Sequence, residues 1–175
     1  MEALGVQAGA HGSVAATGLI IDNLKKVGSG VISYAGGLSG TFIPISEDAG
    51  MADAVKLGWL TFPRFLSMTA VCSVGIDMFI AYWPQTLSQE DFQAHIGGML
   101  LDEMAIGVYT NKTTSSRIIP VPWAPQPDFW VVLMGGAGLL GNAPIMDLQF
   151  DTLPAPNALL NLSGALPAPI TSFRN

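Results

Sequence analysis

Hydrophobic residues spaced three and four positions apart near the start of the chain predict a helix over residues 13–27. Val14, Ile21 and Leu24 fall on one stripe of this helix, and Gly28 stands where a C-cap is expected. The stripe predicts a helix with one buried face.

Three further helices are predicted from their start signals. Ser46 is positioned to cap a helix over residues 47–57, and a second helix is predicted over residues 62–71. Ser88, with an aspartate three positions later, opens a long helix over residues 88–105.

Short apolar runs between the helices predict buried strands, at residues 31–35, 76–82, 117–121 and 129–134. Strands that alternate with helices are typical of an α/β fold with a partly parallel sheet. We therefore predict one α/β unit over residues 1–150.

The last part of the chain has a different pattern. Residues 151–175 contain four prolines in two Pro-Ala-Pro units and show little periodicity, but they carry several leucines. We predict an extended C-terminal arm that lies on another surface, rather than a solvated tail.

The composition predicts that much of the surface is covered by a protein partner. Hydrophobic residues make up 50% of the chain, its mean hydropathy is +0.45, and 11% of its residues are charged. An ordinary soluble domain has about 25% charged residues. A shell this poor in charge favours association with another chain or another copy.

The lengths of the apolar runs, the cysteine count and the net charge indicate where the protein acts and which partners it can have. The longest apolar runs fall far short of the ~18–20 residues of a membrane-spanning helix, and no secretion signal opens the chain. A single cysteine, Cys72, fits a reducing cytoplasm. The net charge of −6 argues against nucleic-acid binding. We expect a cytoplasmic protein with no membrane or nucleic-acid partner.

Residues 107–122, GVYTNKTTSSRIIPVP, place two of the seven basic residues among several hydroxyl groups. One interpretation is a site where Lys112 and Arg117 bind an anion, with Thr113 and Thr114 donating hydrogen bonds. The other is structural, with both cations paired to carboxylates in apolar surroundings.

The carboxylates that could form such pairs are Asp77, between Ile76 and Met78, and the dipeptide at residues 102–103. Glu47 and Asp48 raise a separate choice. They either compensate the dipole of the helix that follows, or act in proton transfer or hold a divalent cation, for which Asp77 is a further candidate ligand.

His11 lies between glycines just before a predicted helix start, where an imidazole can meet a ligand. Both a functional and a structural role stay open for it. His95 is predicted to be a half-exposed structural residue of its helix. Cys72 lies in MTAVCSVGI and is predicted to be buried and inert, since apolar surroundings raise a thiol pKa.

Residues 136–141, GAGLLG, have the spacing of a dinucleotide-binding loop. That function needs a helix at this point and an acidic residue about 20 positions later. Pro144 follows closely and residues 156–161 read PNALLN, so we predict a glycine turn between strands and no nucleotide.

Several long strings of the chain resemble a prokaryotic family called domain of unknown function 711. They occur in the family's order and spacing, cover roughly residues 8–147, and read AGAHGSVAATGLIIDNLKK, GGLSGTFIPISEDAGMADAVKLG, MTAVCSVGIDM, DEMAIGVYTNKTTSSRIIPVP and GGAGLLGNAPIM. Members are more than twice this length, so the chain looks like their C-terminal part.

The resemblance implies half of a pyruvate formate-lyase-like α/β barrel. A partner chain supplying the N-terminal half, or a homo-oligomer, would then complete it. The family commonly has cysteines where this chain has Ala8 and Ala10, while His11 is kept. The string that carries a glycyl radical is missing, so no such radical is expected. The family has no assigned activity.

These observations predict a subunit of an enzyme that converts a small anionic substrate by acid/base chemistry, with a divalent cation as a candidate cofactor. Its catalytic candidates are His11, Glu47 and Asp48, and its substrate-binding candidates are Ser39, Lys112, Thr113, Thr114, Arg117 and Gly136. Two alternatives remain: a structural or regulatory subunit that completes a partner's barrel, and a module that binds a small anion without turnover.

Overall fold

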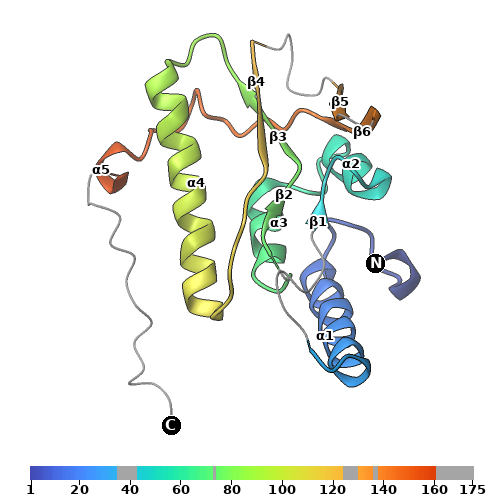
Figure 1. Cartoon of the computed structure of the whole chain (residues 1–175). Coiled ribbons are helices and arrows are strands. Elements are labelled where there is room, and N and C mark those ends of the chain that lie inside the picture. The colour runs from blue at the N-terminus through green and yellow to red at the C-terminus, as the bar shows by residue number, and fades with distance from the viewer. Residues whose placement is uncertain (35–42, 73, 124–129, 136–137, 161–175) are drawn as a thin grey trace.

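The computed structural model describes residues 1–34, 43–72, 74–123, 130–135 and 138–160 (Figure 1). Its elements are η1 (Glu2–Leu4), α1 (Ser13–Val31), β1 (Ile43–Pro44), α2 (Ala49–Lys56), α3 (Phe62–Thr69), β2 (Ile76–Asp77), β3 (Phe79–Trp83), α4 (Gln89–Thr110), β4 (Ile118–Pro122), β5 (Trp130–Gly135), β6 (Gly138–Pro144) and α5 (Asn157–Leu160). The chain therefore has the mixed α/β architecture that its sequence predicts.

The described strands form three two-stranded sheets, β1 with β2, β3 with β4, and β5 with β6. β2 and β3 follow each other along the chain and bring the first two sheets side by side. β1 pairs in parallel with β2, and β4 pairs in parallel with β3. Met146 forms a parallel bridge with Ala81, on the side of β3 away from β4. The long helix α4 connects β3 to β4 and lies beside them (Figure 1), as a crossover between parallel strands requires.

A β-bulge at Met78 separates β2 from β3. The backbone N–H of Arg117 donates to Ile76 O at 3.0 Å, and its carbonyl accepts from Phe79 N at 3.1 Å. A regular parallel ladder would use residues 76 and 78, so one extra residue is inserted. Met78 absorbs it with φ 46°, a backbone region that non-glycine residues seldom adopt.

The outer edge of β4 is poor in hydrogen-bond donors. Arg117 and Trp123 bond to the central strand, so strand alternation turns Ile118, Pro120 and Pro122 toward the outer edge. Proline has no N–H, and natural sheets place it at edges that are not extended. This edge therefore disfavours the pairing of a further strand.

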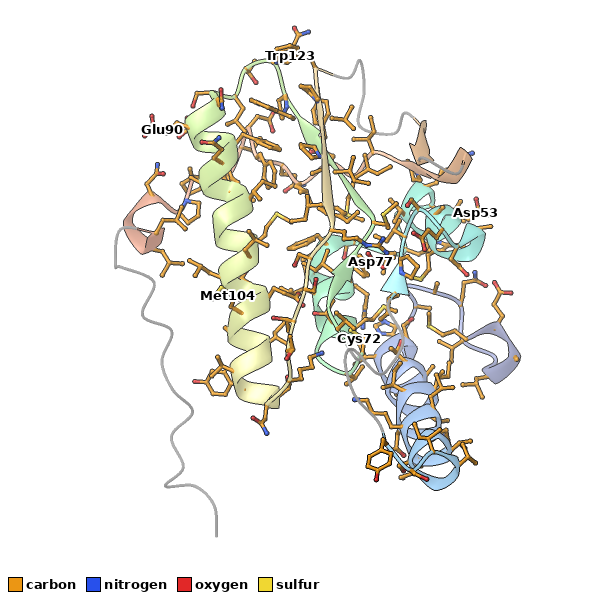
Figure 2. All side chains as sticks on the ribbon, in the orientation of Figure 1. Asp53, Cys72, Asp77, Glu90, Met104 and Trp123 are labelled. Atoms are coloured by element: carbon orange, nitrogen blue, oxygen red, sulfur yellow. The ribbon has the colours of Figure 1, made fainter. Side chains whose placement is uncertain are left out.

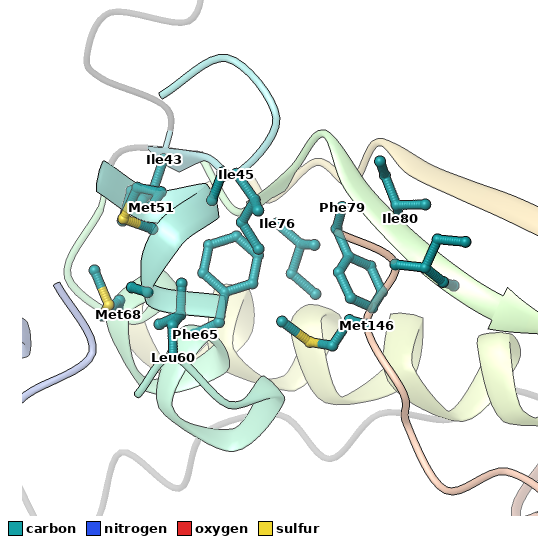
Figure 3. Packing of buried hydrophobic residues seen from close by; sticks show 14 of the residues in the cluster. Ile43, Ile45, Met51, Leu60, Phe65, Met68, Ile76, Phe79, Ile80 and Met146 are labelled. Atoms are coloured by element: carbon teal, nitrogen blue, oxygen red, sulfur yellow. The ribbon is translucent and has the colours of Figure 1, made fainter. Parts of the chain in front are cut away.

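The hydrophobic core lies between the sheet and helices α2, α3 and α4 (Figure 3). Phe65 of α3 and Phe79 of β3 are fully buried, and Leu60, Ile76 and Met146 pack around them. Each fully buried apolar side chain of this size stabilises the fold by about 1.5–3 kcal/mol relative to an exposed one.

Several sequence predictions are confirmed. α4 starts after Ser88, whose hydroxyl oxygen accepts from Asp91 N, and α3 covers most of its predicted range. The apolar run at 76–82 forms β2 and β3 and is buried through Ala81. Residues 138–141 of the glycine-rich string predicted to form a turn belong to β6, which pairs antiparallel with β5. Residues 136–137, between the two strands, lie outside the described part, so the turn itself stays a prediction.

Other predictions are wrong. α1 passes through Gly28 and ends at Val31, so no strand starts at residue 31. The helix after Ser46 begins at Ala49, and its cap is Asp48, whose carboxylate accepts from Met51 N at 2.8 Å. Asp48 is a better cap than Ser46 because a carboxylate at the N-cap also interacts favourably with the helix dipole.

The start of the predicted C-terminal arm packs closely on α4. Residues 157–160 form the short helix α5, which lies beside α4 (Figure 1). A Cβ on Gly98 would come within 2.7 Å of the Pro156 side chain, so glycine permits this close approach. The rest of the arm, residues 161–175, lies outside the described residues.

Within the described ranges, no helix combines the length and the apolar character needed to cross a lipid bilayer.

Candidate functional site

Two polar clusters adjoin the bulged central strand, and each contains a carboxylate that is buried in the core, Asp77 in one and Glu103 in the other. We call Glu47, Asp77 and Arg117 the Arg117 cluster, and Cys72, Glu103 and Lys112 the Lys112 cluster. Asp77 and Cys72 both lie near the middle of the molecule (Figure 2). Buried charges are costly unless they are paired, so each cluster needs a physical account.

In the Arg117 cluster, one guanidinium holds two carboxylates. Arg117 donates from Nε to Asp77 Oδ1 and from Nη2 to Asp77 Oδ2, the latter at 2.6 Å. Its Nη2 also lies 3.6 Å from Glu47 Oε1. The Asp77 side chain is fully buried, whereas the Arg117 side chain is 48% exposed. The hydrogen bonds to Asp77 are the main cause that raises the pKa of Arg117.

The bulge explains why these groups meet. The backbone of Arg117 is hydrogen-bonded to Ile76 and to Phe79. Asp77 therefore lies directly opposite Arg117 across the ladder. Glu47 and Asp48 follow the carboxyl end of β1, and Asp77 is the last residue of β2. Ligand sites of parallel sheets gather at the carboxyl ends of strands. Ser46, also after β1, has a buried hydroxyl oxygen with no hydrogen-bond partner among the described residues.

In the Lys112 cluster, an ammonium group closes a helix end. Lys112 Nζ donates to Thr69 O and, at 2.9 Å, to Cys72 O. Thr69 is the last residue of α3, and Cys72 lies in the turn that follows it. Such carbonyls have no partner inside the helix, and a cation is stabilising there. Asn111, with φ 53°, is the left-handed C-cap of α4 that turns the chain toward this position.

Glu103 lies beside this ammonium group and is only 2% exposed. Its Oε2 accepts from Thr69 Oγ1 at 3.3 Å, while its buried Oε1 has no hydrogen-bond partner among the described residues. Burial raises the pKa of Glu103, against smaller opposing effects of the Thr69 hydroxyl and Lys112. Burial also raises the pKa of Cys72 and lowers the pKa of Lys112.

The structural interpretation of the opening cations fits Arg117, which pairs with Asp77. Lys112 lies near Glu103 but donates to backbone carbonyls instead of a carboxylate. Cys72 is 2% exposed, so its predicted burial is confirmed. Its surroundings are not wholly apolar, however, because Lys112 Nζ lies 3.9 Å from its Sγ.

The remaining site candidates are spread over the chain. His11 and Thr113 are exposed, and Thr114 is half-buried. Ser39 and Gly136 lie outside the described residues. Among the described residues, no three Asp, Glu, His or Cys side chains come together as a metal site. Asp48 already caps α2, and Asp77 accepts from Arg117 with both oxygens.

A family model described as "Uncharacterised ACR (DUF711)" matches residues 1–129. The chain belongs to this family. The UPF0210 proteins of Methanocaldococcus jannaschii and Limosilactobacillus reuteri are 43% and 46% identical to it over 176 residues. Each alignment covers the whole chain but 36% of the relative, so the chain spans about a third of their length.

Membership of the DUF711 family confirms the resemblance seen in the sequence. The match includes all residues of both clusters, from Glu47 to Arg117. The two clusters are therefore part of the region that defines the family, and the family description assigns neither of them a role.

Sequence reasoning about this DUF711 chain missed a third feature, a mostly apolar cavity of about 940 Å³ between α4 and the segment after β6. His95 and Asp102 line it. The prediction of a half-exposed His95 is wrong, since its ring is 7% exposed and stacks on Phe150 with centroids 4.6 Å apart. Phe150 is distant in sequence, so helix periodicity alone could not show this contact.

Sequence reasoning also missed Gly75, which has φ 152°. A Cβ there would lie inside van der Waals contact with Glu103 Oε1 and Ser115 O. A glycine just before a predicted buried strand was the available signal for such a close approach.

Proposed function

We propose that this chain forms part of an enzyme that converts a small anionic substrate by acid/base chemistry, and that the Arg117 cluster belongs to its site. The observation that carries the proposal is the strained bulge at Met78, beside which a fully buried Asp77 meets a half-exposed Arg117. Backbone strain and bulges are over-represented at active sites, where they aim side chains.

In this proposal Arg117 recognises the anionic group of the substrate. Asp77 holds the guanidinium by two bonds, so its plane is fixed before a ligand arrives and less entropy is lost on binding. Glu47 transfers the proton, because it is 3.6 Å from Arg117 Nη2 and its side chain is 32% exposed. His11 is the second proton carrier, and Ser39, Thr113, Thr114 and Gly136 contribute to substrate binding.

Lys112 and Asp48 take supporting parts. Lys112 was a candidate for anion binding, but its ammonium group donates to two carbonyls at the end of α3. Asp48 uses Oδ1 to accept the hydrogen bond from Met51 N that caps α2. We assign both residues to the scaffold of the site, and we leave a divalent cation as a candidate cofactor whose ligands would come from outside these two clusters.

We further propose that the chain is completed by polypeptide that it does not itself contain, as half of an α/β barrel of the pyruvate formate-lyase type. Almost two thirds of the length of each of these relatives lies outside the part that aligns with this chain, which supports the proposal.

Calorimetric titration with inorganic phosphate, acetate and malonate tests the anion site. We expect at least one of these anions to bind, and Arg117→Lys to weaken it by about tenfold, since lysine keeps the charge but loses the planar fork. Arg64→Lys makes the same change in α3 and should leave binding unaltered. Equal effects of the two variants would contradict the assignment of Arg117.

The acid/base part is tested separately, by proton NMR of any bound organic anion during incubation. Glu47→Gln is expected to keep binding and to stop turnover or proton exchange. Glu90→Gln, an exposed residue in the first turn of α4, is the matched control.

The alternative is a structural or regulatory subunit, and the Lys112 cluster favours it because Lys112 closes a helix end beside the buried Glu103. No anion binding by the chain or its complexes, with Lys112→Ala reducing only stability, would support that alternative. Anion binding without any turnover would support a small-anion binding module.

A further inference from the structure

The apolar face of α1 continues past the body of the protein. In the first half of the helix, Ser13, Ala16, Thr17 and Ile21 are buried. At about 100° per residue, Leu24, Val27 and Val31 extend that face along the same side of the helix. These three side chains are 50%, 64% and 76% exposed, and Figure 1 shows this end of α1 projecting from the other elements. We call them the α1 stripe.

The rest of this helical segment has the character of a solvent-facing surface. Asp22 and Lys26, one turn apart, form an exposed ion pair at 2.5 Å. Such a pair on one face and three bare aliphatic side chains on another make the C-terminal half of α1 amphipathic. An amphipathic helix has its apolar face covered in the assembled protein.

We infer that the α1 stripe is the docking surface for the family polypeptide that this chain lacks. The family model includes all of α1, so the helix belongs to the common part of the family. The whole chain aligns with only 36% of each of the two relatives, so both have additional polypeptide that can cover this face. The inference rests on the proposed completion of the chain and names the surface at which it takes place.

The chemistry of the stripe defines what binds it. Leucine and valine side chains without a charge among them pack against an apolar helix or sheet face and gain stability by excluding water. A charge placed among them would be desolvated by the partner without a counter-ion. The occupant is therefore an apolar face of the additional polypeptide and not a charged ligand.

Leu19 provides a matched control. It is 51% exposed, almost the same as Leu24 at 50%, and lies on the same helix. Five helical positions separate the two residues, which places Leu19 about 140° around the helix from Leu24. Leu19→Glu and Leu24→Glu are thus the same chemical change at equal exposure, one outside the stripe and one within it. Circular dichroism of each variant checks that the fold is kept.

The experiment co-expresses this chain with the part of the Limosilactobacillus reuteri relative that it does not match. Size-exclusion chromatography with light scattering measures the complex, and hydrogen exchange follows residues 20–34. We expect a one-to-one complex that protects these residues. Leu24→Glu should weaken it at least about tenfold, and Leu19→Glu by less than about twofold.

The other outcomes separate the two proposals. A complex that tolerates both variants overturns the docking surface but keeps the additional polypeptide as partner. No complex at all overturns both. A chain that is dimeric alone, and monomeric as Leu24→Glu, shows that a second copy covers the stripe. Protection of the stripe in the isolated monomer shows that the chain covers it itself, and this also overturns the inference.

Discussion

The Arg117 cluster and the Lys112 cluster contain the same kinds of charge and differ in how those charges are matched. Arg117 meets both oxygens of Asp77 and remains 48% exposed. Lys112 instead donates to backbone carbonyls, and Glu103 keeps one buried oxygen without a hydrogen-bond partner among the described residues. Matched hydrogen bonding and exposure together favour a recognition site, whereas enclosure favours a structural role.

The difference follows from the two basic side chains. A guanidinium offers a planar fork that fits a carboxylate, so a fully buried Asp77 can stay charged beside it. An ammonium is a compact point charge, and at the end of α3 the ammonium group of Lys112 donates hydrogen bonds to backbone carbonyls. Glu103 nearby then gains less from it than burial costs, which raises its pKa. The comparison predicts different responses to mutation.

The largest effect is expected for Arg117→Ala. It leaves the fully buried Asp77 without its counter-ion, and breaking a buried pair from one side costs about 3–5 kcal/mol. We expect roughly 3 kcal/mol, because Arg117 is itself half-exposed. Urea unfolding of the variant measures the loss. Asp77→Asn should cost less, since Arg117 can then turn to water, and equal losses would contradict this account of the cluster.

Gly75→Ala tests the strand where it passes the Lys112 cluster. The added methyl group collides with Glu103 Oε1 and Ser115 O, and alanine is strained at φ 152°. We expect a loss of roughly 1–3 kcal/mol in the free energy of unfolding. Gly28→Ala is the control, since no atom lies within 4 Å of its Cβ position in α1. That change should stabilise the chain by about 0.5–1 kcal/mol. If both substitutions change the free energy of unfolding alike, the inference that Gly75 is crowded is wrong.

Glu103→Gln sharpens the comparison through pH. The pKa of Glu103 is raised above its ordinary value of 4.5, so the folded state binds this proton more tightly than the unfolded state. The associated stability is complete below pH 4.5 and is lost as the pH rises through the folded-state pKa. Relative to Glu103→Gln, the wild type should lose about 1.4 kcal/mol for each unit of the shift.

Thermal or urea unfolding at several pH values between 4 and 8 measures this difference, and Glu90→Gln corrects for the loss of one surface charge from the same helix. A wild type that instead gains stability relative to Glu103→Gln as the pH rises would mean that Glu103 is held mainly as a charged partner of Lys112, like Asp77 in the other cluster.

The smallest effect is expected for Gly98→Ala, away from both clusters. The methyl group would lie 2.7 Å from the Pro156 side chain, so the segment before α5 must move off α4. Helix propensity offsets part of this cost, and we expect a change in global stability of less than about 1 kcal/mol. Hydrogen exchange of residues 151–160 should nevertheless become faster. Unchanged exchange there would contradict close packing of this segment on α4.

Local signals in the sequence were sufficient for much of the fold. Ser88 and the aspartate after it marked the start of α4, and the apolar run at 76–82 marked the central strands. The bulge at Met78 left no such signal, because methionine is not a residue that favours positive φ. It is maintained by tertiary bonds to Arg117, a residue forty positions away.

The candidate site was partly predictable for the same reason. The cations at 112 and 117 and their acidic partners stood out because charges are scarce in this chain. The sequence left open whether they bind a ligand or each other, and the contacts of Lys112 depend on where α3 ends in space. Likewise, both Ser46 and Asp48 can cap a helix, and the structure shows that Asp48, two residues later, is the cap.

The paired side chains also bear on how the molecule assembles in time. Asp77 with Arg117, Cys72 with Lys112, and Thr69 with Glu103 join positions 34 to 40 residues apart, and all three close the same loop around α4. Contacts at such separation form only after the entropy of closing the loop is lost, which slows folding of parallel β–α–β units. Once the end of α3, β2, α4 and the start of β4 meet, all of these bonds become available together. This unit should therefore protect its amides as one cooperative block and be the last part of the chain to open.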